Sequence, residues 1–308
     1  MRYFLLIFIV ISSLTSINAK AETETTCVRN TDGEIIVAAQ SNVVTDTDGN
    51  QGDACQEIPD VYRLQFYKVG LCTADPMASD PTDYSSCSFF LDSTSASVLD
   101  ITMPASSSLP ITSLPAIGTY GYMVLLISNA LQLQHTEVFS ADVTGSDGVA
   151  GKYCSTNSNI TSYSGTKTQG VIGNPVNPTL ETLSTLGMTC GSTAPTAQFT
   201  TEYMDNFADD PSNDFVADTP GAYTLTGGTM KGRLTQVDNT TTATSVDNSE
   251  RLAVVFTFTT PQTVTSASQY DLNFKIQDSV SVDLSYSNAI YAIKSGANPF
   301  QIYMGISN

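Results

Sequence analysis

The sequence predicts an all-β fold, an antiparallel β-sandwich of one large or two smaller modules held together by disulfide bonds. Three observations lead to this prediction. Charged residues are only 14% of the 308 residues, and Ser, Thr, Asn and Gly fill the gap, a composition typical of short strands joined by many turns. Apolar and polar residues alternate along much of the last third of the chain. Six cysteines follow an export signal.

The first 21 residues have the pattern of a signal peptide. Arg2 supplies the positive charge, residues 4–11 the apolar core, and Ala19-Lys20-Ala21 an A-x-A cleavage site. The apolar core is shorter than the roughly 20 residues that span a bilayer, so we expect cleavage, with an uncleaved anchor as the alternative. The mature protein is then exported to the periplasm, the cell surface or the medium, without an integral membrane span.

Acidic side chains dominate the charge of the chain. The net charge is −18, and it falls to −20 once Arg2 and Lys20 leave with the signal peptide. A chain this acidic repels phosphate backbones and anionic lipids, so we expect no nucleic-acid partner. The same charge attracts Ca²⁺ and favours solubility.

The six cysteines all lie in the exported part, which implies three disulfides in an oxidising compartment. Six cysteines allow fifteen pairings, and loop closure favours near neighbours. We therefore expect sequential pairs, each stabilising the fold by roughly 2–4 kcal/mol. The expected pairs are Cys27 with Cys55, Cys72 with Cys87, and Cys154 with Cys190. There is no C-x-x-C motif, and the single histidine, His135, cannot complete a Cys/His zinc site.

The chain begins, after the signal peptide, with a polar arm at residues 22–59 and a β module at residues 60–145. Residues 61–72 alternate as a strand does, but the apolar parity shifts at Lys68, which indicates a bulge. Residues 73–86 form a polar loop that the disulfide at its two ends would close.

Three further strands are expected in the first module. Two short candidates are residues 89–91 and residues 98–101. Residues 120–127 are apolar at both odd and even positions apart from a glycine, so we interpret them as a central strand covered on both faces.

Gly, Ser and Thr are frequent between residues 146 and 198, which we interpret as a linker or an insertion. Residues 199–308 then form the second β module. Whether the chain has one domain or two stays open at this point. The clearest alternation in the second module predicts strands at residues 252–258, 270–276, 280–286 and 300–306, with a break at Asp278-Ser279 between the second and the third.

The most specific polar segment is an acidic loop in the N-terminal arm. Its spacing matches positions 1, 3, 5 and 12 of an EF-hand loop, but Gln51 stands where that loop needs glycine, and neither flank resembles a helix. A looser Ca²⁺ loop and a turn-rich loop without an ion are the alternatives. The candidate ligands are Asp46, Asp48, Asn50, Asp53 and Glu57.

Catalytic patterns are weak. A second acidic group, Asp205, Asp209, Asp210 and Asp214, could supply the two carboxylates of a glycosidase, but the chain has no tryptophan to stack on sugar rings. G-x-S-x-G and the nucleotide-binding glycine motifs do not occur, and His135 is the only imidazole. We therefore expect no enzyme and, apart from Ca²⁺ at the acidic loop, no cofactor.

These observations favour a non-catalytic secreted or cell-surface protein with a structural or adhesive role, whose partners would be surface proteins or glycans. A secreted or periplasmic ligand-binding module, Ca²⁺-dependent or not, is the alternative. A carboxylate hydrolase ranks third. If the last strand does not fold back into its own sheet, it could add to the sheet of a neighbour.

Overall fold

The computed structural model describes residues 26–37, 52–102, 111–162, 187–205, 215–225, 227–287, 290–297 and 300–307. Strands provide nearly all of the regular structure in these residues, and a three-residue 3₁₀ turn, η2 (Val246–Asn248), precedes β13. The strands form three sheets, in which neighbouring strands are antiparallel except at β8–β10 and at one residue pair between β6 and β16. The predicted all-β, sandwich-like fold is confirmed.

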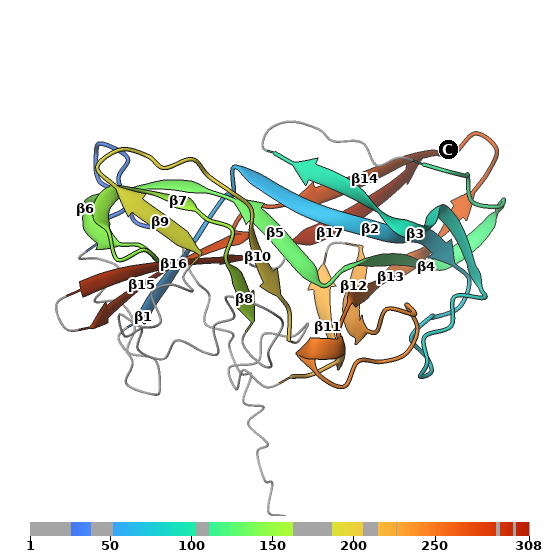
Figure 1. Ribbon diagram of the computed structural model, residues 1–308. Helices are drawn as coiled ribbons and strands as arrows, with labels where there is room; N and C mark the ends of the chain where they lie inside the picture. Colours follow the sequence, from blue (N-terminus) through green and yellow to red (C-terminus); the bar gives the residue numbers. More distant parts are fainter. Residues whose placement is uncertain are drawn as a thin grey trace, which may run out of the picture.

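The first sheet has six strands in the order β1-β15-β16-β6-β7-β9 and lies at the left end of the view in Figure 1. Its strands are β1 (Gly52–Glu57), β15 (Val280–Ser287), β16 (Ile290–Ala297), β6 (Thr136–Thr144), β7 (Ala150–Thr156) and β9 (Met188–Gly191).

The second sheet has nine strands, eight of them in the order β11-β12-β13-β4-β2-β5-β10-β8, with β3 added alongside β2. Its strands are β11 (Asp218–Leu225), β12 (Gly228–Thr235), β13 (Arg251–Val264), β4 (Gly118–Ser128), β2 (Val61–Cys72), β5 (Ala130–Gln134), β10 (Thr200–Tyr203), β8 (Ile160–Ser162) and β3 (Cys87–Ile101). The third sheet is the pair β14 (Gln269–Lys275) and β17 (Gln301–Ser307).

The last four strands form one long bent ribbon. β15 pairs with β16 inside the six-stranded sheet, and the flanking strands β14 and β17 pair with each other outside it. Asp278, at φ 63°, and a hydrogen bond of 2.7 Å from the Ser279 hydroxyl to the Ile276 carbonyl interrupt the ribbon between β14 and β15. The break predicted at Asp278-Ser279 is confirmed, and Figure 1 shows the ribbon running from the left end of the molecule toward the C-terminus.

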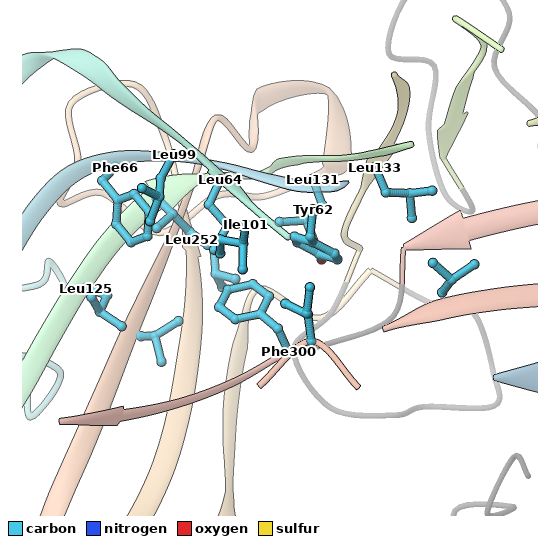
Figure 2. Packing of buried hydrophobic residues seen from close by; sticks show 14 of the residues in the cluster. Tyr62, Leu64, Phe66, Leu99, Ile101, Leu125, Leu131, Leu133, Leu252 and Phe300 are labelled. Carbon is cyan, nitrogen blue, oxygen red and sulfur yellow. The ribbon is translucent and has the colours of Figure 1, made fainter. Parts of the chain in front are cut away.

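The β14–β17 half of the ribbon packs on one face of the nine-stranded sheet. Tyr62 and Phe66 of β2 meet Phe300 and Phe274 edge to face, with ring centroids 5.5 and 5.6 Å apart. Figure 2 shows Phe300 facing the apolar side chains of this sheet. Edge-to-face pairs add to the burial of apolar area, so these contacts fix the position of the ribbon.

The other face of the central strand β4 is covered by a loop. Val124 and Leu126 are fully buried there under residues 73–86, which the Cys72–Cys87 bond closes. The guanidinium of Arg233 donates to the Ser79 carbonyl at 2.6 Å and holds the loop on the sheet. The expectation that both faces of this strand are covered is confirmed.

The three disulfides join the cysteines in the predicted sequential pairs. Cys72–Cys87 connects directly opposite residues of β2 and β3, and Cys154–Cys190 does the same for β7 and β9. The Cys27–Cys55 bond ties the start of the N-terminal arm to β1 near the end of the same arm. Three disulfides fit an oxidising compartment.

One detail of the strands was expected, and the strand divisions elsewhere differ from those expected. The register of β2 shifts between Phe66 and Lys68, so the predicted bulge is confirmed. The two short candidates at residues 89–91 and 98–101 are instead parts of the single strand β3, whose register against β2 also shifts between them. His135 separates the two strands β5 and β6, which otherwise follow one another directly.

The described strands of the two predicted modules pair with each other. β13, from the second module, lies next to β4 of the first, and β16 lies next to β6. The segment expected to be a linker or insertion, residues 146–198, contributes β7, β8 and β9. The division into domains stays a prediction.

Candidate functional site

Four ionisable side chains meet where the N-terminal arm pairs with β6. The guanidinium of Arg29 donates two hydrogen bonds to the carboxylate of Glu137, at 2.9 and 2.7 Å. It also lies 2.8 Å from Glu57 at the end of β1. The Nε2 atom of His135 is 3.2 Å from the same Glu137 carboxylate. We call these four residues the arm cluster.

Backbone contacts bring the members of the arm cluster together. Ile35 adds the arm to β6, since its N–H donates to Val138 and its carbonyl accepts from Ser140, both at 2.8 Å. His135 lies in the break between β5 and β6, and Thr156 of β7 fixes it there through hydrogen bonds of 3.0 and 2.9 Å. The Cys27–Cys55 bond holds the start of the arm beside Glu57.

The two carboxylates of the arm cluster have pKa shifts of opposite sign. Burial raises the pKa of Glu57, and the nearby Arg29 offsets this only in part. Burial also acts to raise the pKa of Glu137, but its hydrogen bonds to His135 and Arg29 outweigh burial and lower the pKa. Arg29 has its own pKa raised by the hydrogen bond to Glu137. His135 and Arg29 together therefore favour the ionised form of Glu137, whereas burial dominates at Glu57.

We expect Glu137→Gln to lower the free energy of unfolding by about 1.5–3 kcal/mol near neutral pH, because it removes charged hydrogen bonds from a buried position. Folding lowers the pKa of Glu137 from its ordinary 4.5, so this stability is present above that pKa and is lost as the pH falls below it. Chemical denaturation at a series of pH values measures the effect.

The matched control is Glu57→Gln. Folding raises the pKa of Glu57, so ionising this group costs stability as the pH rises above 4.5. Removing the charge should therefore leave the stability near neutral pH unchanged to within about 0.5 kcal/mol or raise it. Equal losses in the two variants would contradict the assignment of the guanidinium to Glu137.

The arm cluster joins the N-terminal arm to β6 through ion pairs. The side chains of His135 and Glu137 are each only 4% exposed, so these groups face protein and not solvent. Both oxygens of Glu137 accept hydrogen bonds from Arg29. The arrangement favours a structural role.

A second feature is a row of apolar side chains that the fold holds in solvent. Ile111, Leu114 and Ile117 are 55%, 71% and 72% exposed. Their backbone follows β3: the N–H groups of Thr112 and Ser113 donate to the Phe90 carbonyl at 2.8 and 3.2 Å. The side chains therefore project from an ordered segment. We call these three residues the apolar row.

The predicted Ca²⁺ ligands are only partly placed. Asp46, Asp48 and Asn50 lie outside the described residues, and Asp53 lies in β1 opposite Leu284. The remaining candidate, Glu57, forms the ion pair with Arg29. Within the described ranges, no three His, Cys, Asp or Glu side chains gather in a way that could hold a metal ion. The Ca²⁺ loop stays a prediction.

The second acidic group is also divided. Asp205 is buried, and its backbone carbonyl accepts a hydrogen bond of 2.8 Å from Val216. Asp209, Asp210 and Asp214 lie outside the part of the chain that the structure describes. The pair of carboxylates needed for glycoside hydrolysis is therefore not tested.

Sequence reasoning did not find the arm cluster or the apolar row. Arg29 and Glu137 are 108 residues apart, and no spacing or motif links them. The apolar row had one signal, since Ile111, Leu114 and Ile117 recur every three residues around prolines, which suits neither a strand nor a buried helix.

Comparison with protein-family models, curated proteins and solved structures finds no match. Among the residues that the structure describes, no helix is both long and apolar enough to cross a bilayer.

Proposed function

We propose that this chain is an exported, non-catalytic surface protein with a structural or adhesive role, which binds a partner through the apolar row. The observation that carries the proposal is the exposure of Ile111, Leu114 and Ile117 on a segment that hydrogen bonds to β3 hold in place. Large apolar side chains grouped on an ordered surface are typical of interaction sites. A rigid site also loses little conformational entropy on binding.

Two further observations support this role. The three disulfides suit a protein that works in an oxidising compartment outside the cytoplasm. The charges of the arm cluster hold the N-terminal arm in place. The alternative of a ligand-binding module gains no specific observation.

The test compares how firmly the protein stays on the surface of the cells that export it. We expect the wild type to be retained, and the triple variant Ile111→Asn, Leu114→Asn and Ile117→Asn to show retention at least about tenfold lower. Val237→Asn is the matched control, because Val237 is 68% exposed elsewhere on the molecule. Release of the wild type into the medium, or equal retention of all variants, would overturn the proposal.

A further inference from the structure

The layer formed by β14 and β17 is narrow. Its two strands face a sheet of nine, and its core-facing side chains Tyr270, Leu272, Phe274, Met304 and Ile306 are only partly buried. Their counterparts in the sheet beneath are at most a few per cent exposed, as at Leu64, Leu125 and Leu252. One more strand beside this pair would cover the apolar surface that remains exposed.

β17 has no feature that blocks strand addition. Its sequence, QIYMGIS, contains no charged residue and no proline, although the whole chain carries a net charge of −18. Two other edge strands do carry such features: β11 contains Asp218 and Pro220, and β1 contains Asp53 and Glu57. Unprotected edges pair readily with strands from other chains. Among the described strands, β17 pairs only with β14.

The sequence of β17 is complementary to itself when two copies run antiparallel about Met304. In that register Met304 faces Met304, Ile302 faces Ile306, and Tyr303 faces Gly305. Met304 and Ile306 pack on the core, so by strand alternation the apolar pairs would share that face and the Tyr303–Gly305 pairs the other. Such cross-strand pairs stabilise a sheet, and aromatic cover of an edge glycine is especially favourable.

We propose that β17 is a self-association site, where the β17 strand of a second copy adds antiparallel and joins the two pairs into one four-stranded sheet, β14-β17-β17-β14. The interface is isologous, with its two-fold axis at Met304. It shares no residue with the apolar row, so it does not depend on the proposed function, and either proposal can fail alone.

The strength of the dimer follows from its size and charge. Seven residues per copy form a small interface, so we expect a dissociation constant on the order of 10 µM. Each copy is strongly acidic, so the two copies repel each other over a distance that salt shortens. The dimer should therefore strengthen as the ionic strength rises, the opposite of an interface held by ion pairs.

Sedimentation velocity of the full, oxidised protein tests the site. We expect a concentration-dependent dimer for the wild type, and a monomer for Met304→Lys and for Met304→Glu, because each places like charges opposite each other. An equimolar mixture of the two variants should restore the dimer, because the lysine of one copy then lies opposite the glutamate of the other. The control Val237→Lys, at an exposed position elsewhere, should dimerise like the wild type.

A cysteine variant tests the same site without introducing a charge that could unfold the protein. Directly opposite residues in antiparallel strands lie at a Cα separation that a disulfide can bridge. Met304→Cys should therefore form a covalent dimer on oxidation, and the same substitution at Ile306 should do so far less. A monomeric wild type, a dimer that tolerates both charged variants, or a mixture that stays monomeric although each variant melts cooperatively would each overturn the proposal.

Discussion

Replacing Arg29 with methionine is expected to lower the free energy of unfolding by about 3 kcal/mol near neutral pH. The substitution keeps most of the apolar stem but leaves Glu137 buried without its two guanidinium hydrogen bonds, and Glu57 without its ion pair. Removing one partner of a buried pair costs 3–5 kcal/mol, and we take the lower end because the Arg29 side chain is 33% exposed.

The loss of stability in Arg29→Met should depend on pH. Without Arg29, burial is less opposed, so the pKa of both carboxylates is higher than in the wild type, although the hydrogen bond from His135 still favours the ionised form of Glu137. Protonation removes the uncompensated charge. The difference in the free energy of unfolding between Arg29→Met and the wild type should therefore become smaller as the pH falls below about 5. Denaturant titrations at several pH values measure the gap.

Arg63→Met is the matched control. Arg63 also forms a two-pronged ion pair, with Asp100, but on the surface, where the carboxylate is 44% exposed. Exposed ion pairs of this kind contribute about 0–1 kcal/mol, so Arg63→Met should lower the free energy of unfolding by no more than that. A loss for Arg29→Met no larger than that of the control would show that the arm cluster does not hold the arm.

Gly151→Ala is expected to be nearly as damaging, with a loss of about 3 kcal/mol. A Cβ atom at Gly151 would lie 2.2 Å from the carbonyl oxygen and 2.3 Å from the carbonyl carbon of Gly191 in β9. These are backbone atoms, so relief requires β9 to move away from β7. The Cys154–Cys190 bond three residues further on resists that movement.

Gly121→Ala is the control for this experiment. Gly121 lies in the central strand β4, and a Cβ atom there would have no neighbour within 4 Å. The added methyl group should be neutral or stabilise the protein by up to about 1 kcal/mol, because alanine restricts the unfolded chain. Thermal unfolding followed by circular dichroism compares the two, and equal melting temperatures would contradict the predicted clash.

Local features of the fold could be predicted from the sequence because local residues determine them. The shift of the apolar pattern at Lys68 indicates a bulge whichever strands β2 pairs with. The interruption of the alternation at Asp278-Ser279 likewise does not depend on the sheet in which it lies. The disulfide pairs follow the same logic, since near neighbours close with the least loss of entropy. The joining of residues 89–91 and 98–101 into β3 was missed because the polar residues between them hid a strand that its partner β2 imposes.

The contacts that define the candidate sites depend on distant parts of the chain. No property of Arg29 indicates that it meets Glu137, because the arm reaches β6 only through the fold as a whole. Glu57 was assigned to an acidic loop by its spacing, whereas its position at the end of β1 places it beside a guanidinium. The exposed apolar row was missed because large apolar residues ordinarily predict a core.

The long ribbon of β14 to β17 also sets the order in which the molecule can be completed. β15 and β16 lie between β1 and β6, so the first sheet stays divided until residues near 297 have been synthesised. The cover over Tyr62 and Phe66 arrives later still, with Phe300 and β17. Until then the earlier strands are without their partners, and the cooperative fold can form only after β17 has been translated.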